Sequence, residues 1–274
     1  VSAPGPALKL SELSLSGEAR VNQFQTKAGF STARDYYALD GDVGPDAPGV
    51  APGEVIDLSG KMSADGTLDW TPPKGRWRVV RMGYSLTGAT NHPAPREATG
   101  LEVDKLDATA VRGYLDTYFH AYQDAVGPDL LATHGLKALL ADSTEVGPFN
   151  WTPRMLEQFQ RLRGYDPRPW LPALTGAIVG SRAQSDAFLY DFRRTIGDLY
   201  ASEHYGTLAA FAHDKGLIVY GESLEGLRTS LGDDMDMRRY ADVPMAALWA
   251  FNAETGPKPN YLSDMRGAAS VAHL

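Results

Sequence analysis

The chain contains 274 residues and carries a formal net charge of −8. This acidic balance argues against nucleic-acid and polyanion partners, which require a basic face. The absence of cysteine excludes thiolate catalysis, cysteine-ligated zinc and structural disulfides. The apolar runs are all far shorter than the roughly 20 residues that a membrane-spanning helix needs, so we expect no membrane span.

The first 75 residues predict little regular structure. Residues 1–60 are rich in Pro, Gly, Ala and Ser and indicate an irregular or β-rich segment that wraps a larger body. Asp65-Gly66 lies between two short apolar runs and predicts a tight hairpin turn. Residues 77–84, with β-branched and aromatic side chains, predict a strand. We therefore expect an N-terminal irregular or β-rich segment over residues 1–75 and a β/α domain over residues 76–274.

Helical and strand patterns alternate in the rest of the chain. The first helix is predicted over residues 106–126 and ends at Gly127-Pro128. Its predicted buried face holds Val111, Leu115, Tyr118, Phe119 and Tyr122. The further predictions are a buried strand at 136–141, a helix from the N-cap Thr152 to about Arg163, an irregular insertion at 165–182, a helix at 185–215, and strands at 217–220 and 243–251 followed by a helix from 263 to the end.

This alternation predicts an α/β fold with parallel strands joined by helical crossovers. A complete (β/α)8, TIM-like barrel takes roughly 250 residues, whereas the β/α pattern begins only near Trp77. About four strands therefore fit before Leu274. Two alternatives remain open, a smaller open sheet and a barrel that this chain contains only in part.

Two glutamates follow predicted strands, and active sites of parallel α/β folds gather at the carboxyl ends of strands. Glu145 closes the run Asp142-Ser143-Thr144-Glu145, and Glu222 follows Gly221. Glycoside hydrolysis requires one protonated carboxyl group and one carboxylate, which two such strand ends could supply. The alternative is that each glutamate is an ordinary solvated loop residue.

Several neighbours are candidates for binding a sugar. Asp142 and Ser143 could bond hydroxyl groups, while Asn150 and Trp151 offer an amide beside an aromatic face. Asn91, His92 and Asp104 follow the predicted strand at 77–84, and Trp249 lies near the end of the last one. Each has a structural alternative: Asp104 could pair with Lys105, and both tryptophans could belong to the core.

Other site motifs are missing from the sequence, including phosphate-cradling glycine loops, paired metal-ligating histidines and the Gly-x-Ser-x-Gly elbow. The cluster Asp233-Asp234-Met235-Asp236 is too irregular for an EF-hand loop. It is acidic enough to bind calcium, although a solvated loop is the default interpretation.

A series of sequence blocks, in order, resembles the α-L-rhamnosidases of glycoside hydrolase family 106. The resemblance extends from about residue 54 to the end, and the density of the blocks makes it more specific than any single motif. The blocks are residues 55–58, 75–81, 83–93, 98–106, 142–145, 150–152, 163–166, 191–194, 221–222 and 242–245.

The resemblance implies a β/α barrel flanked by β domains, in proteins much longer than this chain. It implies removal of terminal α-L-rhamnose from polysaccharides or glycosides with inversion, by two glutamates, with calcium at the sugar site. Glu145 then takes the role of general acid. The base is a second glutamate, expected on a later strand beyond Leu274, and Glu222 is either that base or a ligand of sugar or calcium. A periplasmic or secreted location is also implied, although no signal peptide is visible in these residues.

Two other interpretations remain open. The chain could be a non-catalytic, carbohydrate-binding or structural piece of such an enzyme, or a retaining glycosidase that uses Glu145 and Glu222. The sequence names neither the glycosidic linkage nor the oligomeric state.

Overall fold

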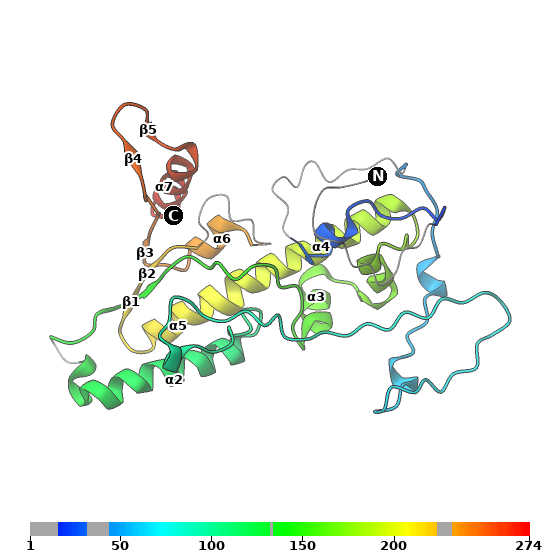
Figure 1. The fold of residues 1–274 in the computed structure, drawn as a ribbon, viewed down its shortest axis with the longest axis horizontal. Coiled ribbons are helices and arrows are strands. Elements are labelled where there is room, and N and C mark those ends of the chain that lie inside the picture. Colours follow the sequence, from blue (N-terminus) through cyan, green and yellow to red (C-terminus); the bar gives the residue numbers. More distant parts are fainter. Residues whose placement is uncertain (1–15, 32–43, 132–133, 224–231) are drawn as a thin grey trace, which may run out of the picture.

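The computed structural model describes residues 16–31, 44–131, 134–223 and 232–274. A long helical rod crosses the molecule, a small parallel sheet lies at one end of it, and an extended segment leads away from the other end (Figure 1). The helices of this structure are α1 (Phe24–Lys27), η1 (Pro52–Glu54), η2 (Ser59–Lys61), η3 (Arg96–Ala98), α2 (Ala108–Val126), η4 (Pro128–Leu131), α3 (Met155–Arg163), η5 (Arg168–Thr175), α4 (Arg182–Leu199), η6 (Tyr200–Gly206), α5 (Thr207–His213), α6 (Asp234–Arg238) and α7 (Pro259–Val271). The strands are β1 (Ala138–Ala141), β2 (Ile218–Gly221), β3 (Val243–Pro244), β4 (Phe251–Asn252) and β5 (Gly256–Pro257).

The rod is the helix predicted at 185–215, and it consists of α4, η6 and α5 in direct succession. Its start is fixed by a capping box, in which the Ser181 hydroxyl accepts the Gln184 amide and the Gln184 side chain accepts the Ser181 amide. Gly216, at φ 70°, ends it as predicted. The sequence did not predict η6, a π-helical stretch whose hydrogen bonds join residues five apart.

The sheet has the order β1-β2-β3, and both pairings are parallel. Its register pairs Ala138 with Ile218 and Ala141 with Gly221, so β1 and β2 end at the same edge. Helix α2 packs against α5, and α5 packs against β2. This confirms the predicted parallel α/β arrangement for three strands, while the described residues do not form a complete barrel.

One core cluster joins the rod to the segments around it. Phe188, Phe192 and Ile196 of α4 pack with Phe159 of α3, and all four side chains are almost fully buried. The predicted irregular insertion at 165–182 contributes to this cluster through η5. The N-terminal segment is tied to it by isolated bridges, Pro48 with Ser181 and Val50 with Val179.

The strand predicted at 77–84 is wrong, because these residues are extended but pair with no described strand. Apolar side chains alone do not make a strand, which needs a partner for its backbone N–H and C=O groups. Val79 remains 57% exposed and Tyr84 64% exposed. The turn at Asp65-Gly66 is confirmed, with a single antiparallel bridge between Met62 and Leu68.

Two further predictions need correction in detail. Tyr118 and Tyr122 lie on the exposed face of α2, although Val111, Leu115 and Phe119 are buried as expected. Strand β1 is only half-buried, because Leu140 is 69% exposed.

Three elements also differ in their boundaries. Helix α3 begins at Met155, and the Thr152 hydroxyl donates to Asp104 instead of capping it. The strand predicted at 243–251 divides into β3 and β4, which belong to different sheets. Helix α7 begins at Pro259, four residues before the predicted start, because proline suits the first helical turn.

None of the helices in the described ranges combines the length and apolarity needed to cross a membrane.

Candidate active site at the ends of two parallel strands

The loops after β1 and β2 leave the sheet side by side. The Glu222 amide donates to the Ala141 carbonyl at 3.0 Å, which extends the ladder by one bond beyond the register. The Thr144 amide then donates to the Ser223 carbonyl at 3.1 Å. Two of the predicted catalytic residues, Glu145 and Glu222, therefore belong to loops that are bonded to one another. Both side chains are partly buried.

The loop after β1 organises its own polar groups. The Ser143 amide donates to Asp142 Oδ1 at 2.8 Å, and the Ser143 hydroxyl donates to Glu145 Oε1 at 3.1 Å. Asp142 itself is exposed at the strand end. The structure thus brings together the predicted run Asp142-Ser143-Thr144-Glu145, with Ser143 orienting the glutamate.

A hollow of about 410 Å³ is lined by Val146, the residue after Glu145, whereas neither Glu145 nor Glu222 lines it. Its residues come from the loop after β1 and from the extended segment, and they are Tyr84, Ser85, Leu86, Thr87, Ala89, Glu102, Val103, Asp104, Lys105, Val146, Phe149, Trp151 and Pro153. Trp151 stacks with Tyr84, with ring centroids 6.2 Å apart and an interplanar angle of 28°. Its ring also lies near Phe192 of the core, so Trp151 both lines the hollow and packs against the core.

Asp104 lines this hollow but has internal partners for both oxygens. Its Oδ1 accepts the Leu106 amide at 2.9 Å, and its Oδ2 accepts the Thr152 hydroxyl at 2.8 Å. The alternative that Asp104 pairs with Lys105 is not realised, because the buried Lys105 bonds to Glu102 instead. Asp104 therefore positions the chain around the hollow, joining the extended segment to the start of α3.

Four of the sugar-binding candidates lie elsewhere. The Asn91 side chain donates to the Ala98 carbonyl and accepts the Gly100 amide, which closes a turn. His92 beside it is exposed. The Asn150 amide donates to the Ala28 carbonyl and holds the N-terminal segment. Trp249 is 77% exposed and lines no described hollow, because β3 ends at Pro244 and no strand carries this residue towards the site.

The acidic cluster at 233–236 is engaged by cations and backbone groups. Asp233 caps α6 by accepting the Met235 and Asp236 amides. Asp234 pairs with Arg238, and Asp236 pairs with Arg194. Over the described ranges no three His, Asp or Glu side chains gather as a metal site would require. The calcium expectation thus finds no such ligand set among the described residues.

Two residues of η6, the buried Tyr205 and the partly buried His204, lie beside these loops although the sequence did not predict them. The Tyr205 hydroxyl lies 3.1 Å from Thr144 Oγ1 and donates to the Ser223 carbonyl at 2.9 Å. His204 contacts the Tyr205 ring, and its Nδ1 is buried without a partner among the described residues. Burial lowers the pKa of His204 to about 3, and the nearby charge of Lys105 acts in the same direction. Helical periodicity gave no signal for either residue, because apolar and aromatic side chains at helical spacing indicate only a core.

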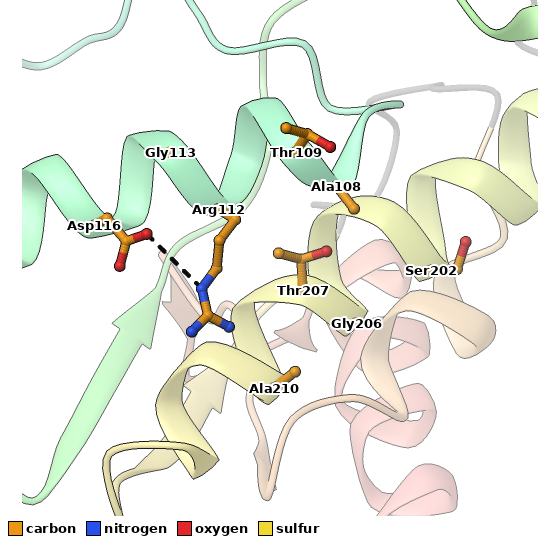
Figure 2. Close-up of a pocket in the computed structure, with 9 residues that line it drawn as sticks. All are labelled: Ala108, Thr109, Arg112, Gly113, Asp116, Ser202, Gly206, Thr207 and Ala210. Carbon is orange, nitrogen blue, oxygen red and sulfur yellow. Dashed lines mark ion pairs between the residues drawn. The ribbon is translucent and has the colours of Figure 1, made fainter.

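A second depression of about 780 Å³ separates α2 from η6 and α5. Figure 2 shows Arg112 reaching across it beside Asp116, with small side chains such as Ala108, Gly206 and Ala210 around it. The guanidinium group pairs with Asp214 at 2.9 Å. None of the predicted site residues lines this depression, which is a furrow that small side chains leave between helices.

Comparison with known proteins agrees with the geometry. A solved structure of a rhamnosidase from Novosphingobium sp. PP1Y is 60% identical and superposes with a TM-score of 0.88, over 95% of this chain and 25% of that chain. A curated protein of Formosa agariphila, named a putative beta-glucuronidase, is 33% identical over 255 residues, which are 93% of this chain and 21% of that protein. The chain therefore spans a quarter or less of the length of these relatives. The alpha-L-rhamnosidase model of glycoside hydrolase family 106 matches residues 3–274, and the chain belongs to that family.

Proposed function

We propose that the protein carrying this chain is a glycoside hydrolase that releases terminal α-L-rhamnose from a polysaccharide or glycoside with inversion. The observation that carries the proposal is the joining of two glutamate-bearing loops at adjacent strand ends, next to an aromatic hollow. In this proposal Glu145 is the general acid. A second glutamate, either Glu222 or one on a later strand, activates water.

The lining of the hollow favours a neutral deoxysugar. Leu86, Val103 and Val146 offer apolar surface for the methyl group of rhamnose, and the Trp151 ring offers a face for its C–H groups. The sugar hydroxyls would meet the polar groups at the edge of the hollow, including Ser85 and Thr87. A 410 Å³ hollow lies within the range of small-molecule sites.

A second candidate is hydrolysis of a glucuronide, which the name of the Formosa agariphila relative suggests. The charged side chains lining the hollow are Glu102, Asp104 and Lys105, two carboxylates and one ammonium group. Lys105 is already paired with Glu102. The carboxylate of a glucuronide would therefore meet a net negative lining, which disfavours it. The rhamnoside is the better fit.

The alternation of β1, β2 and β3 with helices supports the further proposal that they are consecutive strands of a (β/α)8 barrel. A periplasmic or secreted location is likewise a proposal, which cell fractionation with detection of the native protein would test.

The first experiment compares hydrolysis of nitrophenyl α-L-rhamnoside and nitrophenyl β-D-glucuronide by the protein at its natural length. We expect turnover of the rhamnoside, with kcat in Glu145→Gln lower by about a thousandfold, at the upper end of general acid catalysis. The matched control is Glu157→Gln, which changes an exposed glutamate paired with Arg154 on α3. Full activity in Glu145→Gln would refute its role as the acid.

The second experiment identifies the partner of Glu145. NMR of the first anomer released distinguishes inversion from retention, and retention would favour a mechanism through Glu145 and Glu222. In Glu222→Gln, a lower kcat indicates the base, whereas a higher KM with unchanged kcat indicates a sugar ligand. Binding of rhamnose without turnover would support the non-catalytic alternative.

A further inference from the structure

Tyr205 contacts both of the loops that carry the candidate carboxylates. Its side chain comes from η6, and the residue is only 5% exposed. Its hydroxyl donates to the Ser223 carbonyl and lies within hydrogen-bond distance of Thr144 Oγ1. Thr144 precedes Glu145, and Ser223 follows Glu222. One buried oxygen therefore bonds to both glutamate-bearing loops.

We propose that Tyr205 is a positioning residue, whose hydroxyl fixes the loops after β1 and β2 so that the carboxyl groups of Glu145 and Glu222 keep a set separation. The inference rests on the proposed function for its effect on catalysis, but not for its effect on the loops. The separation matters because the distance between the two carboxyl groups decides whether a water molecule fits between them.

The hydroxyl is suited to this role because it keeps its proton. Burial raises the pKa of Tyr205 to about 12, so the group remains a donor to Ser223 at any working pH. The ring is held by neighbours on the same helix, with Tyr200 at 5.5 Å and His204 at 4.9 Å between centroids. A donor held this firmly loses little entropy when it bonds the loops.

The π-helical turn η6 orients the Tyr205 side chain towards the strand ends. Hydrogen bonds between residues five apart interrupt the α-helical spacing of the rod at Tyr200–Gly206. The three-part rod can thus pack α4 into one core cluster and α5 into the other, with Tyr205 aimed at the strand ends between them. Short π-helical segments recur at functional sites in other proteins.

The loop after β2 has a second anchor, which keeps the fold intact when the first is removed. The Ser223 hydroxyl bonds to Asp234, and Asp234 pairs with Arg238 of α6. The Thr144–Ser223 backbone bond also remains when the tyrosine oxygen is deleted. Tyr205→Phe therefore loosens the loops without unfolding the protein.

The test is Tyr205→Phe in the protein at its natural length, with Tyr165→Phe as the matched control. Tyr165 also donates its hydroxyl to a partly buried partner, Asp191 at 2.9 Å, but it bonds to neither glutamate-bearing loop. We expect kcat on nitrophenyl α-L-rhamnoside to fall by about 10–100-fold in Tyr205→Phe with KM changed less than about threefold, since small misplacements of catalytic groups cost up to about 100-fold. Tyr165→Phe keeps the wild-type kcat.

A second readout does not depend on activity. Hydrogen exchange of the Thr144 amide and of residues 221–223 is expected to accelerate at least about tenfold in Tyr205→Phe and to stay unchanged in Tyr165→Phe. Unchanged exchange would overturn the inference, whatever the activity. Faster exchange with full kcat would overturn the claim that Tyr205 affects catalysis. A wild-type protein that hydrolyses no rhamnoside would refute the proposed function and leave the effect on the loops standing.

The pairing itself is tested by a double-mutant cycle with Thr144→Val, which removes the second hydroxyl. If both act through one bond, Tyr205→Phe and the double variant have nearly the same kcat. If the fold-losses in kcat of the two single variants multiply in the double variant, the two hydroxyls act independently. That result would overturn the proposal that they act through one bond.

Discussion

The two walls of the hollow are built in different ways. One wall, which we call the body wall, consists of Val146, Phe149, Trp151 and Pro153 and follows β1. Its aromatic rings continue into the core, with Phe149 against Tyr200 and Trp151 against Phe192. The other, the strip wall, belongs to the extended residues 76–105.

The strip is held by turns and by single contacts. Many of its apolar side chains are exposed, as Leu86 is at 78%, and the residues at 71–88 form no strand ladder with any described residue. By contrast, the apolar run at 138–141 has a neighbour at β2 and becomes a strand. A β-forming composition therefore specifies a strand only where an adjacent strand bonds to its backbone N–H and C=O groups.

The largest expected difference between the regions concerns their ion pairs. We call the packed part of the chain after residue 105 the body, and residues 76–105 the strip. In the body, Arg238 is fully buried and bonds to Asp234, Asp264 and the Met245 carbonyl. Arg238→Met leaves the buried Asp264 carboxylate without its cation, so we expect the free energy of unfolding to fall by about 3–5 kcal/mol. Urea denaturation measures this change.

The control lies in the strip. Arg78 pairs with Glu18 at 2.8 Å, but both side chains are at least half exposed. Arg78→Met is expected to leave the urea midpoint unchanged, because solvent-exposed pairs contribute little. Equal destabilisation by Arg78→Met and Arg238→Met would break the distinction between a packed body and a loosely held strip.

The next difference concerns the two stacked rings. Trp151 contacts the core, so Trp151→Ala is expected to cost about 2–4 kcal/mol, somewhat less than a fully buried aromatic ring. Tyr84 is 64% exposed, and Tyr84→Ala should cost under about 0.5 kcal/mol. Both variants should raise the KM for a rhamnoside, since each removes one ring of the stack. Thermal unfolding combined with kinetics separates the two effects, and a Tyr84→Ala variant as unstable as Trp151→Ala would contradict the comparison.

The sequence predicted the body much better than the strip. The helix at 106–126, the strands at 136–141 and 217–220 and the long helix ending at Gly216 follow from local patterns, because periodicity, caps and glycines act over a few residues. The strand at 77–84 failed because its outcome depends on a partner that local patterns do not contain.

The candidate site was predicted in the same uneven way. Glu145, Glu222, Asp142 and Ser143 could be placed because strand ends in parallel sheets share one edge. The misplaced candidates Asn91, Asn150 and Trp249 are polar or aromatic residues in loops, and only tertiary contacts decide what such residues bond. Tyr205 was missed although it lies in a predicted helix, since a π-helical turn changes which side chains of a helix face the sheet.

The smallest effect at neutral pH comes from His204, whose ring contacts Tyr200, a neighbour of Phe149 in the body wall. Its pKa is about 3 in the folded protein, below the usual histidine value of 6.5, because burial disfavours the charged ring. The unfolded chain therefore binds the proton first, so the stability that neutral His204 provides is present above about pH 6.5 and is lost as pH falls towards about 3. The free energy of unfolding should decline with a slope approaching about 1.4 kcal/mol per pH unit in this window.

The window between pH 6.5 and 4.5 isolates this histidine, because the carboxylates with lowered pKa values, such as Asp57 and Asp242, lose their contribution only at lower pH. His204→Gln should flatten the slope there, since an amide at this position does not titrate. His120→Gln, which changes an exposed histidine of α2, serves as the control for removing any imidazole. Urea denaturation at half-unit pH steps measures the slope. A wild-type curve that is flat across this window would contradict the lowered pKa of His204 and would mean that water reaches its ring as freely as it reaches the strip.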